Sequence, residues 1–464
     1  MENSAKISRN SFLTSAIIIF SIMMIAGILT ILLPSGEYER AFIDGRTVII
    51  EGSYHIIEKP YYPFFRWLTA PIEVLWSPDA VLVITIILFI LVVSGSIYIL
   101  NKTHVIEHII NNIVKRYSRQ KSIFLALVVL VFMLLGSLMG IFEEIIPLVP
   151  IMVMFSISLG WDDLAGLGMS LLATGFGFSA ALANPFSLGV AQKIAGVPLF
   201  SGIGFRTIIF ITTYLLVLFF LRRYTKTHQK EVLEQKIDAV NYDENTAKAS
   251  KISLLMLSIL FVLILFSGFT GFLSDLMLPI VALLFLLTGF LSGLVVERNI
   301  STVFKDFLIG TKDILLGVPL VLMAVSVKLI ITNGKIIDTI LHQAYIAISA
   351  YGPFTAVFLV YLLFFIMDLF VPSASTKAFL IMPVVAPLAD LVGITRQTIV
   401  LAFMFGDGFS NLLYPTNPVL LISLGLVGVS YFKWFKFVWK IQLIVFLLSL
   451  FYLYIAVRIG YGPI

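Results

Sequence analysis

Two polar stretches rich in helix breakers lie between apolar runs long enough to enter a membrane. They are residues 372–383, with the sequence PSASTKAFLIMP, and residues 406–418, with the sequence GDGFSNLLYPTNP. Hydrocarbon offers backbone N–H and C=O groups no partner, so non-helical backbone persists at bilayer depth only where protein buries it or where it lines a cavity. The two stretches are therefore the first candidates for a binding site.

The composition places the chain among polytopic membrane proteins. Hydrophobic residues make up 59% of the 464 residues and charged residues 12%, whereas a soluble domain usually has about a quarter of its residues charged. We attribute the net charge of +5 to cytoplasmic loops rich in Lys and Arg, and we expect no nucleic-acid partner. Because the chain has no Cys, disulfides and thiolate chemistry are excluded.

Apolar runs predict an all-α integral membrane protein with about nine transmembrane helices. Seven spans are continuous and cover residues 11–33, 80–100, 204–221, 252–273, 277–296, 314–331 and 437–457. The other two, residues 163–198 and 395–430, are helices broken at Asn184-Pro185 and Asn417-Pro418.

Two further segments are predicted as re-entrant hairpins, residues 122–160 and residues 351–391. In the first, the returning run over residues 148–159 has only about twelve apolar residues, which is too few to cross a bilayer. Glu143 and Glu144 lie near the tip of this hairpin. A charged tip at membrane depth again indicates a site.

These elements divide the chain into five parts. They are an N-terminal span with an outside loop (1–78), a first repeat (79–222), a cytoplasmic linker (223–251), extra scaffold spans (252–312) and a second repeat (313–464). This layout puts every basic cluster on the cytoplasmic side, as the positive-inside rule requires, with the N-terminus cytoplasmic and the C-terminus outside. The linker is polar enough to be mobile.

We also predict the structure of several connecting segments. Residues 34–78 fit an outside loop with an interfacial rim of aromatic side chains. Residues 101–117 and 334–350 fit amphipathic arms along the membrane surface. Residues 298–312 are expected to be a basic loop, and Lys328 is expected to extend its ammonium group toward the membrane surface.

The two halves of the chain match at an offset of 233 residues. The aligned pairs are Pro150 with Pro383, Gly160 with Gly393, Gly175-Phe176 with Gly408-Phe409, and Asn184-Pro185 with Asn417-Pro418. These residue types decide where a membrane helix starts or breaks. An uneven number of crossings separates the copies, which predicts an inverted-topology repeat with its binding site near the midplane.

Four motifs carry a resemblance to a known family. They are FEEIIP at residues 142–147, PSASTK at 372–377, FGDGFSN at 405–411 and PTNP at 415–418. The chain resembles the YfcC-type, arginine/ornithine antiporter-like basic amino acid antiporters. That family is similar to the anaerobic dicarboxylate and aminobenzoyl-glutamate carriers of the ion transporter superfamily. The resemblance implies a secondary transporter of the cell inner membrane that works by alternating access, and it implies a homodimer.

Charged residues at the tips and breaks point to the chemistry of the site. A charge at the bilayer centre costs about 3 kcal/mol, so Glu143, Glu144 and Asp407 must be protonated, paired, or exposed to water and ligand. The offset between the halves also places Glu144 opposite Lys377. The two hairpin tips are therefore expected to bring opposite charges to the midplane.

We expect the tips and breaks to bind a small charged metabolite. Its carboxylate would meet Lys377, nearby hydroxyls and a helix amino terminus, and its cationic group would meet a glutamate or Asp407. The candidate substrate-binding residues are Glu143, Glu144, Ser373, Ser375, Thr376, Lys377, Asp407 and Asn411. The candidates for a coupling-cation site are Asn184, Thr416 and Asn417.

The charged residues favour a cationic amino acid as the substrate, and the resemblance implies exchange of basic amino acids of the arginine and ornithine type. The alternative is symport of dicarboxylates or other small carboxylates, driven by Na⁺ or H⁺. No cofactor is expected beyond such a coupling ion. A channel would need a continuous polar stripe, and a membrane enzyme would need a convergent catalytic set, so neither is favoured.

Overall fold

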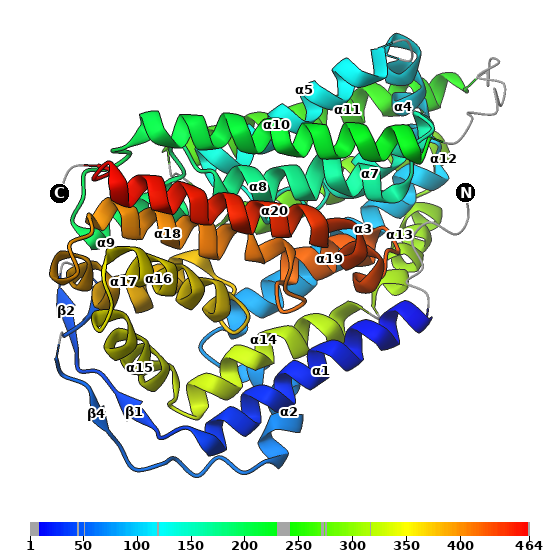
Figure 1. The fold of residues 1–464 in the computed structure, drawn as a ribbon. Coiled ribbons are helices and arrows are strands. Elements are labelled where there is room, and N and C mark those ends of the chain that lie inside the picture. The colour runs from blue at the N-terminus through cyan, green and yellow to red at the C-terminus, as the bar shows by residue number, and fades with distance from the viewer. Residues whose placement is uncertain are drawn as a thin grey trace.

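The computed structural model describes residues 9–43, 46–50, 52–117, 120–229, 242–270, 273, 276–315 and 317–462. Over these residues the chain forms an all-α integral membrane fold (Figure 1). Helix α1 (Arg9–Leu32) begins at the right of Figure 1, and helix α20 (Tyr431–Arg458) ends at the left. We call the first side the N-terminal face and the second the C-terminal face.

Eight helices within the described ranges are long and apolar enough to cross a membrane. They are α1, α3 (Ala80–Lys102), α5 with its π-helical extension (Lys121–Met139), α10 (Ile203–Thr227), α11 (Glu244–Thr270), α12 (Met277–Glu297), α17 (Ala374–Leu391) and α20. A pair bent by 46°, α13 (Ile300–Ile314) with α14 (Gly317–Asn333), would make a ninth. The number agrees with the prediction, but the set differs, because the predicted nine included the two broken helices and excluded α5 and α17.

The two hairpins enter the fold from opposite faces. The first consists of α5 (Lys121–Leu134) and α6 (Leu148–Ser158), and the second of α16 (Pro353–Asp368) and α17. Helix α5 follows α4 at the N-terminal face, whereas α16 follows α15 at the C-terminal face (Figure 1). With eleven residues, the returning limb α6 extends only about 16 Å, which is too short to cross a bilayer.

The broken helices are interrupted at the predicted Asn-Pro pairs. The first runs through α7 (Asp163–Leu167), a π-helical turn (Gly168–Leu172) and α8 (Ala173–Ser179), and resumes at a second π-helical turn (Pro185–Gly189) and α9 (Val190–Ala195). The second runs through α18 (Arg396–Gly408) and a short 3₁₀ turn, η7 (Ser410–Leu412), and resumes as α19 (Pro418–Leu426). Each continuing segment has Pro in its first turn, where a missing N–H is harmless.

Contacts between α8 and the α18–η7 segment show that the two halves pack around a pseudo-twofold axis. A Cβ atom on Gly175 would lie 2.6 Å from Leu412 Cδ1, and one on Gly408 would lie 2.4 Å from Ser179 Oγ. The offset of 233 residues converts the first pair into the second. Reciprocal contacts of this kind are the mark of a twofold interface.

One predicted loop is wrong, because residues 298–312 fold mostly as α13. Asn299 begins this helix by accepting hydrogen bonds from the N–H groups of Ser301 and Thr302, at 2.9 and 3.4 Å. Helix α13 packs against α3, and Lys102 Nζ lies 2.7 Å from Asp306 Oδ1. The face of α13 that packs against α3 is made of small and polar residues such as Asp306 and Gly310, whereas its large apolar side chains, Ile300, Phe304 and Leu308, are exposed.

The segment over residues 34–78 is more ordered than a loop. It contains the strand pairs β1 (Gly36–Glu37) with β4 (His55–Ile56) and β2 (Arg40–Ile43) with β3 (Arg46–Ile49), helix α2 (Phe65–Glu73) and a 3₁₀ turn (Val74–Trp76). Tyr61 and Trp76 are exposed, but Trp67 is buried against Gly27 of α1. Trp67 therefore belongs to the core and not to an aromatic rim.

The remaining connections follow the expected arms. Helix α4 (Val105–Tyr117) buries Val105, Ile106, Ile109 and Ile110, as an amphipathic helix should, and α15 (Ile337–Ser349) occupies the equivalent place in the second half. Helix α10 continues to Thr227 and α11 starts at Glu244, so both ends of the predicted linker are helical. Its middle, residues 230–241, lies outside the described residues.

Gly177→Ala should destabilise the protein, because the added Cβ would lie 2.1 Å from the backbone oxygen of Met133 where α8 crosses α5. Overpacking of this kind costs about 1–3 kcal/mol. The melting temperature in detergent, followed by intrinsic fluorescence, measures the effect. Gly204→Ala is the matched control, since its Cβ would meet no atom within 4 Å. Equal melting temperatures for the two variants would contradict the close crossing.

Candidate functional site

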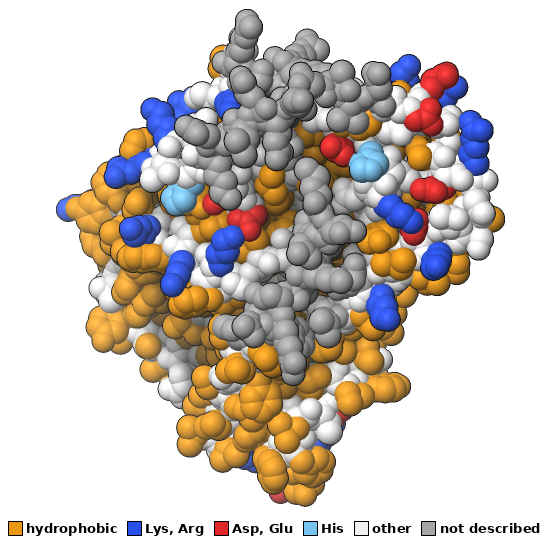
Figure 2. Space-filling view, turned by 90° about the vertical axis from the view of Figure 1, so that its right-hand side faces the viewer, with side chains coloured by type: hydrophobic (Ala, Val, Ile, Leu, Met, Phe, Trp, Pro, Cys, Tyr) orange, Lys and Arg blue, Asp and Glu red, His pale blue; other side chains and the backbone are white. Residues whose placement is uncertain are grey.

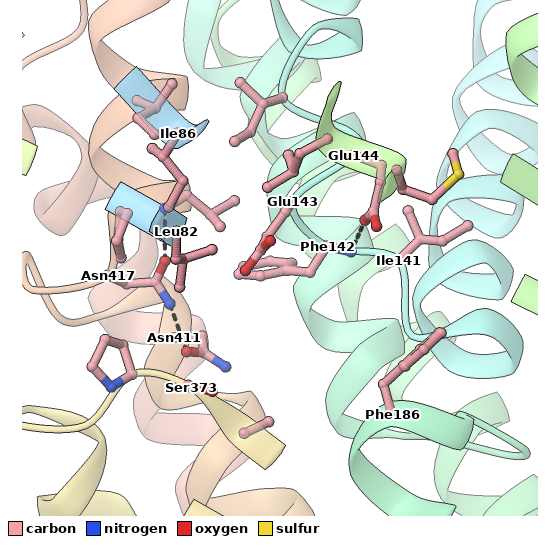
Figure 3. Close-up of a pocket in the computed structure, with 18 of the residues that line it drawn as sticks. Leu82, Ile86, Ile141, Phe142, Glu143, Glu144, Phe186, Ser373, Asn411 and Asn417 are labelled. Carbon is pink, nitrogen blue, oxygen red and sulfur yellow. Dashed lines mark hydrogen bonds between the residues drawn. The ribbon is translucent and has the colours of Figure 1, made fainter. Parts of the chain in front are cut away.

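A cavity of about 310 Å³ lies between the two hairpin tips and helices α3, α11, α12 and α14 (Figure 3). The lining residues of α3, α11 and α12 come from the part of each helix nearer the C-terminal face, such as Leu82, Ser267 and Met277. The opposite wall is built from the tips and from the break before α19. The cavity therefore lies between the polar hairpin tips and the ends of α3, α11 and α12 that are nearer the C-terminal face.

The first hairpin tip supplies two carboxylates. Gly140, at φ 70°, ends the helical limb and turns the chain, and Asn184 packs against it so closely that a Cβ there would lie 2.2 Å from Asn184 Oδ1. Glu143 points into the cavity, while Glu144 Oε2 accepts a hydrogen bond from the Phe142 N–H at 3.3 Å (Figure 3). Neither glutamate has an ion-pair partner among the residues that the structure describes.

The second helix break supplies an oriented amide. Asn417 Oδ1 accepts hydrogen bonds from the N–H groups of Val419 and Leu420, at 2.9 and 3.4 Å, which caps α19. The Asn417 amide nitrogen must therefore donate, and it does so to Asn411 Oδ1 at 2.6 Å (Figure 3). This chain of hydrogen bonds leaves the Asn411 NH₂ group as a donor on the cavity wall.

The second hairpin tip presents the start of α17 to the cavity. Ser373 caps this helix by accepting a hydrogen bond from the Thr376 N–H at 3.4 Å, and the Thr376 hydroxyl lies 2.9 Å from Ser373 Oγ. Ser373 and Ser375 line the cavity, and Thr376 does not. Backbone N–H groups and the positive end of the helix dipole make such a terminus favourable for an anion.

Lys377 does not reach the cavity. Its ammonium group forms ion pairs with Asp368 and with Asp407, whose Oδ1 lies 2.6 Å away, and all three side chains are fully buried. Ser410 Oγ lies 2.7 Å from the second Asp368 oxygen. Lys377 is therefore paired within its own half of the protein, and it does not face Glu144.

Asp368 is a residue that the sequence analysis missed. It lies at the end of the otherwise apolar run of α16, FFIMD. A single carboxylate in such a run is costly in a membrane and marks a functional place by default. That signal was present in the sequence.

A second ion pair lies on the scaffold side of the cavity. Lys328 Nζ of α14 lies 2.8 Å from Asp79 Oδ2, just before α3, and both residues line the cavity. Lys328 therefore pairs inside the protein, contrary to the expectation that its ammonium group would extend to the membrane surface.

The three candidate cation ligands lie at the helix breaks but have different hydrogen bonds. Asn184 Oδ1 accepts from the N–H groups of Phe186 and Ser187, at 2.9 and 3.1 Å, and Asn417 Oδ1 is occupied in the same way. Thr416 Oγ1 is buried without a hydrogen-bond partner. Of the three side chains, only that of Thr416 thus keeps an oxygen that is not engaged within the described structure.

The structure therefore divides the predicted site residues into two groups. Those that line the cavity are Glu143, Glu144, Ser373, Ser375, Asn411 and Asn417. Those that do not line it are Thr376, which is partly exposed, and the buried residues Asn184, Lys377, Asp407 and Thr416.

Comparisons with known proteins found a matching family model, related sequences and a solved structure. The family model described as C4-dicarboxylate anaerobic carrier (DcuC) matches residues 12–458. The Escherichia coli protein named "Putative basic amino acid antiporter YfcC" is 28% identical over 461 residues, which cover 90% of this chain and 91% of that protein. An uncharacterized protein of Haemophilus influenzae is 26% identical over 500 residues, which cover 94% and 95% of the two chains. The crystal structure of the YdaH transporter of Alcanivorax borkumensis aligns with a TM-score of 0.45 and 16% identity, over 97% of this chain and 99% of that one.

The placement of the second hairpin tip predicts a pattern of chemical labelling. Because the natural chain has no Cys, a single introduced thiol is the only one present. Ser375→Cys, on the cavity wall, should react with a water-soluble maleimide in detergent solution. Ser423→Cys, which is fully buried in α19, is the control and should stay unmodified until the protein unfolds. Mass spectrometry measures both, and equal labelling rates would contradict the cavity described here.

Proposed function

The chain belongs to the C4-dicarboxylate anaerobic carrier family and is a multi-pass membrane transporter; we propose that it exchanges basic amino acids of the arginine and ornithine type across the cell inner membrane. The observation that supports this substrate class is the charge of the cavity. Glu143 and Glu144 line it without cationic partners, and Lys328, the cation among its described lining residues, is neutralised by Asp79. A net negative cavity favours a substrate with an extra positive charge.

The two walls of the cavity fit the two ends of such a molecule. A guanidinium or side-chain ammonium group would bind at Glu143 and Glu144, because charge-assisted hydrogen bonds to carboxylates are the strongest available there. The α-carboxylate would bind at the start of α17, near Ser375, and at the NH₂ group of Asn411. A dicarboxylate would place its second carboxylate against the glutamates.

The mechanism that we propose moves the hairpins and broken helices as one unit against a scaffold of α3, α11, α12 and α14. The cavity lies between these two sets of helices, so their relative motion would close it on one face and open it on the other. An empty unit would carry Glu143 and Glu144 uncompensated past the scaffold, which is unfavourable in a membrane. A bound cation neutralises them, which favours exchange over unidirectional transport.

The charges of the N-terminal face support the orientation in which this face is cytoplasmic. Lys and Arg side chains lie over the upper part of this face in Figure 2, with Asp and Glu side chains among them, and Arg222, Arg223, Lys226 and Arg298 are exposed at the helix ends. Positive charges concentrate on the cytoplasmic side of membrane proteins. In this orientation the cavity is directed outward.

Thr416 would be the first residue to test for a coupling cation.

Counterflow in proteoliposomes tests the proposed exchange. Vesicles that contain the purified protein and internal ornithine should accumulate labelled external arginine without any ion gradient. Uptake that depends on a Na⁺ or H⁺ gradient would refute exchange. Transport of succinate in place of arginine would instead support the carboxylate symport suggested by the family description.

Glu143→Gln should weaken arginine binding about 10- to 100-fold, because a hydrogen bond to a charged group contributes roughly 1.5–3 kcal/mol. Competition by unlabelled arginine in the counterflow assay measures the affinity. Glu58→Gln carries the same substitution at an exposed position away from the cavity and should behave as the wild type. An unchanged affinity in Glu143→Gln would remove this carboxylate from the substrate site.

A further inference from the structure

Three helices of the second half bury a charged cluster that the proposed substrate site does not use. Asp368 ends α16, Lys377 lies in the first turns of α17, and Asp407 lies near the end of α18. Lys377 Nζ contacts a carboxylate oxygen of each aspartate, and none of the three side chains has any exposed surface. We refer to these three residues as the Asp–Lys–Asp cluster.

The cluster contains two acids for one base. Fully ionised, it would carry an excess negative charge where no solvent reaches, and an uncompensated buried charge costs several kcal/mol. The nearby titratable side chains are the phenols of Tyr361 and Tyr414, which carry no positive charge. The tyrosines of α15 and α20, Tyr345, Tyr431, Tyr452 and Tyr454, also carry no positive charge. On the packed helices, the other charged side chains and the histidine within the described residues are exposed or paired elsewhere: Lys193, Asp338, His342, Asp390, Arg396, Lys433, Lys436, Lys440 and Arg458.

Hydrogen bonds in the cluster indicate that a proton on one of the carboxyl groups compensates the excess negative charge. Ser410 Oγ lies 2.5 Å from the Gly406 oxygen and 2.7 Å from Asp368 Oδ2, but a hydroxyl has a single hydrogen to donate. If it donates to Gly406, the contact with Asp368 requires a hydrogen on the carboxyl group. Oδ2 of Asp407 is buried and has no hydrogen-bond partner among the described residues, which makes it a poor place for a full negative charge.

We propose that the Asp–Lys–Asp cluster is a proton-binding site, in which the carboxylates of Asp368 and Asp407 share one proton around the ammonium group of Lys377. With the proton bound, the cluster is neutral. When the proton leaves for water, both carboxylates are ionised, Lys377 stays charged, and the cluster gains one negative charge. This inference rests on the chain being a transporter and not on which substrate it carries.

The position of the cluster links this proton to the cavity. Lys377 follows Ser375 by two residues along α17, and Asp407 precedes Asn411 by four, so each lies within about one turn of a cavity-lining residue. The neutral cluster holds α16, α17 and α18 together beneath the second hairpin tip. Loss of the proton favours entry of water between them, which displaces the tip. Proton binding and substrate binding therefore act on the same hairpin.

Infrared difference spectroscopy of the purified protein, between acidic and alkaline buffer, detects the proton directly through the C=O stretch of a protonated carboxyl group. The wild type should show this band at neutral pH and lose it at high pH. Asp407→Asn and Asp368→Asn should both lack it, because each leaves one carboxylate paired with Lys377. Both substitutions keep the side-chain shape and mimic the neutral acid, so the variants should fold, and either one is sufficient for the test.

Controls separate this site from other acids. Asp390→Asn, at the exposed ion pair with Arg396, should keep the band. The double variant Glu143→Gln, Glu144→Gln should also keep it. A band that survives in both cluster variants, or that disappears only in the double glutamate variant, would overturn the proposal.

The link to transport is tested by the pH dependence of arginine affinity. In the wild type the affinity should fall as the pH rises, by up to tenfold per pH unit for one linked proton, and in Asp407→Asn this dependence should vanish. Titration of the cavity glutamates would have the opposite sign, because their ionisation strengthens cation binding. An affinity that falls equally with pH in Asp407→Asn would refute the link. A wild type that does not bind arginine would refute the proposed substrate, while the infrared result would still decide the proton site.

Discussion

This fold depends on satisfying the hydrogen bonds of backbone groups that water does not reach. Two helices are interrupted within the membrane, and at each break a single asparagine oxygen, from Asn184 or Asn417, accepts the first N–H groups of the helix that resumes. In lipid these groups would otherwise lack partners. Because the asparagines satisfy the backbone locally, the breaks can face a cavity instead of being sealed inside protein. The hairpin tips then gather at these breaks, as Gly140 does against Asn184.

The protein handles costly membrane charges in two different ways. Glu143 and Glu144 face a cavity, where water or a ligand can compensate them, whereas Asp368 and Asp407 are placed around one ammonium group with no exposed surface. Hydration suits a group that must meet a changing partner, and fixed pairing suits a group that must hold helices together. The two sets lie in different halves of the chain, so the halves share a backbone plan but carry different chemistry.

Much of the architecture could be predicted from the sequence, because helix breaks and hairpins are local events with local signals. Asn-Pro pairs and an offset of 233 residues located both breaks and the inverted repeat. Pairing between distant charges left no such signal. The basic residues of 298–312 predict a loop, and the ion pair between Asp306 and Lys102 that helps to hold this segment as a helix against α3 leaves no local signal in the sequence. Lys377 was assigned to a substrate carboxylate because Asp368, nine residues earlier, was read as part of an apolar limb.

The pseudo-twofold axis between the two halves relates two glycine contacts that differ in their chemistry. Gly175 packs against Leu412, while the related Gly408 packs against Ser179, so one side of the axis carries a bulky apolar group and the other a small hydroxyl. In an inverted repeat, alternating access moves one set of helices against another around a central site. Two identical halves would give two end states that are related by the twofold axis and equal in energy. Under the mechanism that we propose, unequal packing at the axis makes the two end states differ in energy, so that an unloaded molecule would rest in one orientation.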